Sequence, residues 1–137
     1  MVNRYSQLRS AIAVLAASPQ IQVDWLDQHL APLTLDGNAE AYGNIELIET
    51  FTDIFYGVAH MLEHEELTKQ EINAISRLDM RIKDICAQED ERLWERNALF
   101  SDGRWQTLRS LAAEVLAQLP DEERESDYTR ALRDNGS

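Results

Sequence analysis

The chain has 137 residues, a formal net charge of −12 and a single cysteine, Cys86. A domain of this length buries roughly two thirds of its unfolded surface in one core, so it needs no disulfide. One cysteine excludes an internal disulfide framework and favours a reducing compartment. No stretch approaches the roughly 18 uninterrupted apolar residues of a membrane span. We therefore expect a single-domain cytoplasmic protein, whose first residues form a helix and not a cleaved signal peptide.

The hydrophobic pattern is helical almost throughout, and the alternation typical of strands is nearly absent, which predicts an all-α protein. A first amphipathic helix is expected over residues 3–17, because Pro19 disfavours helix in the residue before it. A short second helix is expected over residues 22–31. Residues 32–43 contain an Asp-Gly-Asn sequence and a further glycine, so we predict a loop of about a dozen residues before the third helix.

The third helix is predicted over residues 44–65. Asn44 is its expected N-cap, and Glu46 lies in its first turn, where the helix dipole favours a negative charge. Its apolar residues fill nearly half of the helix circumference. An apolar face this wide indicates a central helix of the bundle.

A fourth helix is predicted to begin at the capping box formed by Thr68 and Glu71. Apolar residues continue at helical spacing as far as Leu93, but Glu89 falls on the same face. A carboxylate on an apolar face is costly without a partner across the bundle. We therefore expect the helix to bend or fray at residues 88–90.

Two further helices are expected toward the C-terminus. One begins after a turn and cap at residues 101–103 and ends near residue 120. The other, over residues 121–133, has little apolar surface to bury, and residues 134–137 are expected to be disordered. The sequence thus predicts one helical domain over residues 1–133, a bundle of five to six helices with antiparallel neighbours.

The negative charge is concentrated in one part of the chain. Between Arg9 and Lys69 there is no lysine or arginine, while the acidic residues are Asp24, Asp27, Asp36, Glu40, Glu46, Glu49, Asp53, Glu63, Glu65 and Glu66. Acidic proteins usually intersperse both signs of charge, as residues 67–100 do. A block of one sign creates a field that attracts partners of the opposite sign.

Helical geometry places part of this charge on one face of the third helix, opposite its apolar side. The residues on that face are Glu46, Glu49, Asp53, Tyr56, His60 and His64. The simplest interpretation is the solvated face of an amphipathic helix. As a functional hypothesis, we predict a partner-binding surface made of Asp36, Glu40, Glu46, Glu49, Asp53, Tyr56 and Glu63.

The predicted function is that of an acidic protein-binding module that neutralises a basic macromolecular partner. The most concrete form is an immunity-type inhibitor of a bacterial toxin such as a nuclease, by analogy of size and charge. Direct binding to nucleic acid is disfavoured, because a polyanion repels a chain of this charge. No catalytic motif or cofactor motif is recognisable, so we expect neither an enzyme nor a cofactor.

Metal binding is a first alternative. Residues 60–64 have the H-x-x-E-H spacing that inverted zinc proteases use, and Asp53, His60 and His64 together offer three ligands for a helical enzyme or sensor. The chain is much shorter than those proteases, and no downstream helix supplies an obvious carboxylate as the third metal ligand. The solvated-face interpretation is therefore favoured over a metal site.

A homo-oligomeric regulatory or structural protein is a second alternative, with exposed apolar surface on the second or fifth helix as the contact. Trp25 and Trp94 stand off the main apolar faces of their helices, and an exposed tryptophan marks a binding surface. Packing against a neighbouring helix is favoured for both. Trp105 is in phase with its helix and is expected in the core, and Cys86 is expected to be a structural thiol.

Overall fold

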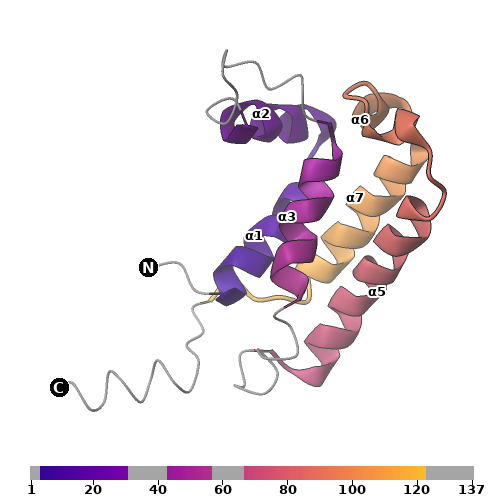
Figure 1. The fold of residues 1–137 in the computed structure, drawn as a ribbon. Coiled ribbons are helices and arrows are strands. Elements are labelled where there is room, and N and C mark those ends of the chain that lie inside the picture. Colours follow the sequence, from indigo (N-terminus) through magenta and orange to yellow (C-terminus); the bar gives the residue numbers. More distant parts are fainter. Residues whose placement is uncertain (1–3, 31–42, 57–66, 123–137) are drawn as a thin grey trace.

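The computed structural model describes residues 4–30, 43–56 and 67–122. These residues form six α-helices and one 3-10 helix, and no strand occurs among them. The all-α fold class is therefore confirmed. The helices pack as a bundle in which α1, α3, α5 and α7 run along one another while α2 crosses one end (Figure 1).

The first two helices follow the sequence prediction closely. Helix α1 spans Arg4–Ala16 and buries one face, which includes Tyr5, Leu8 and Ile12. Helix α2 spans Pro19–Leu30 and begins earlier than predicted. Proline is favourable in the first turn of a helix, where its missing N–H would have no helical partner.

Helix α3 spans Ile45–Phe55, with Tyr56 as its C-cap, and residues 57–65 of the predicted helix lie outside the described ranges. Asn44 is the N-cap residue of α3, as predicted, but its side chain makes no capping hydrogen bond. Asn44 is fully buried, and its amide instead donates to the carbonyl oxygens of Leu93 and Glu95. The start of α3 is therefore fixed by a tertiary contact and not by a local cap.

Helix α5 spans Lys69–Cys86 and begins with the predicted capping box, in which Thr68 and Glu71 each accept from the backbone N–H of the other. It ends at Cys86, and Glu89 adopts a left-handed conformation with φ of 52°. The break predicted at residues 88–90 is confirmed. Ending the helix exposes Glu89, whereas continuing it would place an unpaired carboxylate against the core.

The chain after the break forms two short elements before the last described helix. The 3-10 helix η3 spans Glu91–Trp94 and buries Leu93, and α6 spans Ala98–Ser101. Helix α7 spans Gly103–Leu116 and is capped by the side chain of Asp102. The cap was predicted from sequence, but Leu93 reaches the core from η3 and not from a continued helix.

Neighbouring helices in the bundle are antiparallel, as predicted. Helix α7 packs against both α1 and α5, and α1 also packs against α3. At one end of the bundle, the hydroxyl of Tyr5 and the guanidinium of Arg9, both on α1, donate to the carbonyls of Pro120 and Leu119 beyond α7. These contacts join the start of α1 to the end of α7 (Figure 1).

Buried polar side chains hold α2 on the bundle. Gln22, on α2, is fully buried, and its amide donates to the carbonyls of Val14 and Leu15 at the end of α1, each at 3.1 Å. Its oxygen accepts from the Arg109 guanidinium of α7 at 3.1 Å. One side chain therefore links three helices.

Several predicted elements lie outside the described ranges. These are the loop of about a dozen residues after α2, apart from Gly43, the third helix beyond Tyr56, and the sixth helix and tail beyond residue 122. They stay predictions. Within the described ranges, no helix combines the length and the apolar character needed to cross a membrane.

Candidate partner-binding surface

The outer face of α3 carries the acidic residues that were predicted to share it. Leu47, Ile48 and Phe51 turn toward the core, so α3 is amphipathic. On its other side Glu49 and Asp53 are exposed and Glu46 is partly exposed. Tyr56, the C-cap of the helix, is 82% exposed. The predicted alignment of these four residues away from the core is therefore confirmed, and they are called the acidic face below.

The carboxylates of the acidic face are close enough to affect one another. The pKa of Glu49 is raised, first by partial burial and then by the negative charges of Glu46 and Asp53. Like charges disfavour the ionised form of a neighbouring acid. No ion pair within the described ranges involves Glu46, Glu49 or Asp53. The face is therefore a concentrated negative charge, whereas Asp27, Asp79, Asp90 and Asp102 are each paired with a lysine or arginine.

A lysine lies near the end of the acidic face. Lys83, on α5, binds Asp79 of the same helix with 2.8 Å between Nζ and Oδ2. The pKa of Lys83 is raised mainly by this hydrogen bond and this charge, with a smaller contribution from Tyr56. Tyr56 is therefore within electrostatic reach of Lys83, but the ammonium group is held by Asp79 and not by the acidic face.

Other predicted site residues cannot be placed. Asp36, Glu40 and Glu63 lie outside the described ranges, as do His60 and His64. The alternative metal site of Asp53, His60 and His64 is therefore untested. Among the residues that the structure describes, no group of three or more His, Cys, Asp or Glu side chains is arranged to hold a metal ion.

The tryptophans pack as the sequence favoured. Trp105 is fully buried, and Trp25 and Trp94 are partly buried against the core. The rings of Trp94 and Trp105 meet edge to face, with 6.3 Å between their centroids. Cys86 is also partly buried against the core, and this burial raises its thiol pKa. None of these side chains offers an exposed anchor for a partner.

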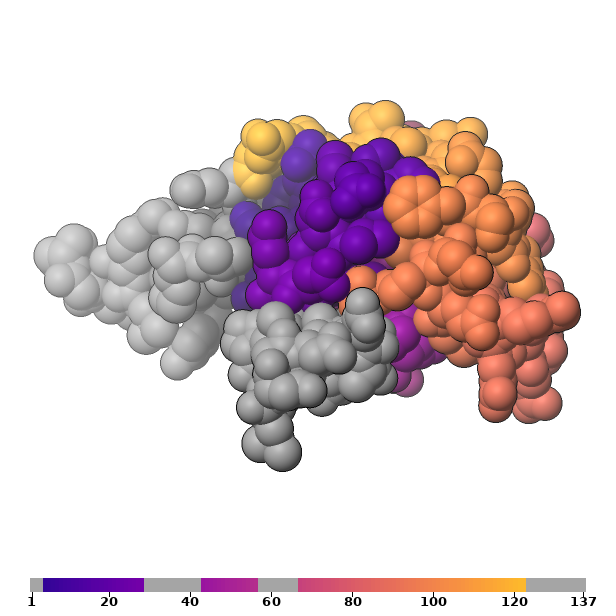
Figure 2. Space-filling model, turned by 90° about the horizontal axis from the view of Figure 1, so that it is seen from above, coloured from indigo at the N-terminus to yellow at the C-terminus, as the bar shows by residue number. Residues whose placement is uncertain are grey.

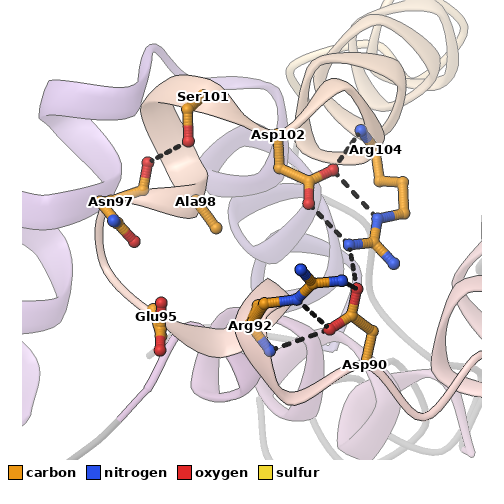
Figure 3. Close-up of a pocket in the computed structure, with 8 residues that line it drawn as sticks. All are labelled: Asp90, Arg92, Glu95, Asn97, Ala98, Ser101, Asp102 and Arg104. Carbon is orange, nitrogen blue, oxygen red and sulfur yellow. Dashed lines mark hydrogen bonds and ion pairs between the residues drawn. The ribbon is translucent and has the colours of Figure 1, made fainter.

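A polar pocket of about 360 Å³ lies where η3, α6 and the start of α7 meet. Figure 3 shows that the side chains of Asp90, Arg92, Asp102 and Arg104 point toward one another. The Arg104 guanidinium binds Asp90 at 2.9 Å and Asp102 at 2.7 Å, and it also donates to Gln88. Arg92 binds Asp90 from the other side at 3.1 Å. These ion pairs and hydrogen bonds stabilise the segment that connects α5 to α7.

The electrostatics of this pocket are those of a paired cluster. Hydrogen bonds from Arg92 and then from Arg104 lower the pKa of Asp90 to about 2. Hydrogen bonds from Asp102 and then from Asp90 raise the pKa of Arg104. Each charged group is stabilised by its neighbour. We therefore assign the cluster a structural role.

Replacing Asp90 by asparagine is expected to reduce stability at neutral pH and to have less effect in acid. The carboxylate pKa is depressed in the folded state, from 3.8 to about 2, so its contribution is present above pH 3.8 and is lost as the pH falls through 2. Urea midpoints measured from pH 7 to pH 2 should converge for wild type and Asp90→Asn. The control is Glu91→Gln, an exposed neighbour. A difference that persists unchanged at pH 2 would contradict the assignment.

Sequence reasoning missed the buried polar residues that position the helices. Arg109 is 8% exposed, and burial lowers its pKa. The signal was present, because Arg109 falls at helical spacing between Trp105 and Ala112 on the buried side of α7. A charged residue on an apolar face indicates a buried partner. The spacing of residues in the sequence could not predict that this partner is Gln22.

An ion pair between described residues joins the α2 end of the bundle to the pocket region. Figure 2, which views the molecule from above, shows α2 beside the segment that contains α6. Arg96 binds Asp27 of α2 with 3.0 Å between Nη1 and Oδ1. Asp27, which lies in the segment without lysine or arginine, is therefore paired, unlike the carboxylates of the acidic face.

Comparisons of the chain with protein-family models, with curated proteins and with solved structures find no match in any of the three.

Proposed function

We propose that the protein is an acidic binding module that neutralises a basic macromolecular partner. The acidic face of α3 carries this proposal, because its carboxylates are aligned, solvent-accessible and without an ion pair among the described residues. Elsewhere on the structure, Asp27, Asp79, Asp90 and Asp102 each bind a lysine or arginine. Unpaired acids on one face are available to a partner's bases.

The charge distribution supports fast and specific association with such a partner. Clustered surface charges steer diffusional encounter and fix the orientation of the complex more than they add affinity. Ten acids and no lysine or arginine lie between Arg9 and Lys69. We propose that Asp36, Glu40 and Glu63 from this block extend the acidic face.

The most concrete form of the proposal is an immunity-type inhibitor of a bacterial toxin such as a nuclease, acting in the cytoplasm. A nuclease that binds phosphates through lysines and arginines presents a basic active-site surface. The Glu46, Glu49 and Asp53 carboxylates would occupy the positions of those phosphates and pair with lysines and arginines of the enzyme. This step rests on analogy of size, helical fold and charge.

Two variants with the same net charge test the proposal. In the first, Glu46, Glu49 and Asp53 are replaced by Gln, Gln and Asn. In the second, the same replacements are made at Asp84, Glu91 and Glu114, which are exposed on other elements. Each variant loses three negative charges, so any difference between them reports position and not net charge.

The proteins should be immobilised, and basic proteins retained from a lysate of the source cells should be identified. The association rate of a retained protein with wild type should then be measured at several salt concentrations. We expect a rate about tenfold lower for the α3 variant than for the control variant, a steep loss with salt, and inhibition of the retained protein's activity. Equal rates for both variants, or a rate independent of salt, would overturn the proposal.

A further inference from the structure

Tyr56 is the most exposed of the large apolar side chains that the structure describes. Its exposed fraction is 82%, against 64% for Met80, 57% for Phe100 and 56% for Ile21. Burying an aromatic ring is strongly favourable, and tyrosine is enriched among the residues that dominate binding energy in interfaces. An aromatic side chain this accessible is thus available for contact with a partner.

The position of Tyr56 gives that contact a chemistry. Tyr56 follows Asp53 by three residues and Glu49 by seven, so the ring stands on the same side of the helix as the two carboxylates. Among the described bases, Lys83 is engaged by Asp79 at 2.8 Å, and none forms an ion pair with Glu49 or Asp53. A cation from a partner can therefore contact both a solvent-exposed aromatic ring and carboxylates that have no ion pair among the described residues.

Arginine fits this arrangement better than lysine. A guanidinium is planar and weakly hydrated, so it stacks on an aromatic face while its N–H groups donate to a neighbouring carboxylate. An ammonium group is compact and strongly hydrated, and it gains less from the ring. One arginine can therefore satisfy Tyr56 and Asp53 together.

We infer that Tyr56 is the specificity-determining residue of the acidic face, which selects an arginine-bearing segment of the basic partner over a lysine-bearing one. This inference rests on the proposed function. The carboxylates attract any basic side chain, and the ring discriminates between arginine and lysine.

The test uses fluorescein-labelled nona-arginine and nona-lysine as probes, with dissociation constants measured by anisotropy at physiological salt. Tyr56→Ala is expected to reduce the preference for nona-arginine about threefold, the size of an exposed cation–π contact. Tyr56→Phe keeps the ring and should keep the preference. Phe100→Ala, which removes another exposed aromatic side chain, should leave it unchanged.

An arginine preference that survives Tyr56→Ala, or one that Phe100→Ala reduces equally, would overturn the inference. The charge-matched variants separate this failure from failure of the proposed function. In one outcome, the α3 variant binds both peptides more weakly than the control variant while Tyr56→Ala leaves the preference unchanged. That result would support the acidic face as a binding surface and contradict the role of Tyr56. If the two charge variants bind both peptides equally, both proposals fall.

Discussion

Replacing Gly43 by alanine is expected to lower the free energy of unfolding by about 3 kcal/mol, or about 10 °C in melting temperature. A Cβ atom at this position would lie 2.6 Å from the backbone oxygen of Trp94. The backbone at Gly43 or at Trp94 would have to shift to relieve this clash. The shift would also break the hydrogen bond from the Asn44 N–H to the same oxygen, which is 2.9 Å long, and the buried Asn44 side-chain bonds beside it.

Gly103→Ala is the matched control for this prediction. Nothing lies within 4 Å of a Cβ atom built on Gly103, and alanine is the better helix former at the start of α7. This control should therefore be neutral or slightly stabilising. Urea denaturation of both variants provides the measurement. Equal unfolding free energies for the two would show that the approach of Gly43 to Trp94 is not required.

The Gly43 contact also bears on the proposed function, because it fixes the start of α3. Asn44 joins that start to η3 through the carbonyls of Leu93 and Glu95, and the indole of Trp105 donates to the Leu93 carbonyl as well. The orientation of the acidic face is therefore set from a segment some fifty residues further along the chain.

Replacing Gln22 by alanine is expected to lower the free energy of unfolding by about 3 kcal/mol, the second large effect. The change removes two hydrogen bonds to the carbonyls of Val14 and Leu15 and leaves the buried Arg109 guanidinium without its Gln22 oxygen. A buried charge that loses a hydrogen-bond partner is more costly than a neutral group. The remaining described partner of that guanidinium is Gln106, at 3.3 Å.

Two further variants test the physical reason. Gln28→Ala, an exposed glutamine on the same helix, should change the unfolding free energy by less than about 0.5 kcal/mol. The double variant Gln22→Leu with Arg109→Met should be more stable than Gln22→Ala, because it removes the buried charge together with its partner. Urea denaturation decides both points. A double variant no more stable than Gln22→Ala would show that the unpaired Arg109 charge is not the reason for the loss.

The acidic face was predictable because it depends on local geometry alone. Helical spacing places Glu46, Glu49, Asp53 and Tyr56 together wherever the helix lies in the bundle. The polar pocket was not predictable, since Asp90 precedes η3 whereas Asp102 and Arg104 lie at the start of α7. Nothing in their spacing indicates that the chain turns back to bring them together.

The sequence by itself determined what repeats over one helical turn or lies within one cap. The helical class, the capping box of Thr68 and Glu71, the break near Glu89 and the outward side of α3 are of this kind, because each depends on neighbours within a few residues. Only the tertiary structure decided the roles of Asn44 and Gln22. Their partners lie on other elements, and an amide side chain bonds to whichever carbonyl or guanidinium the packing of the helices brings to it.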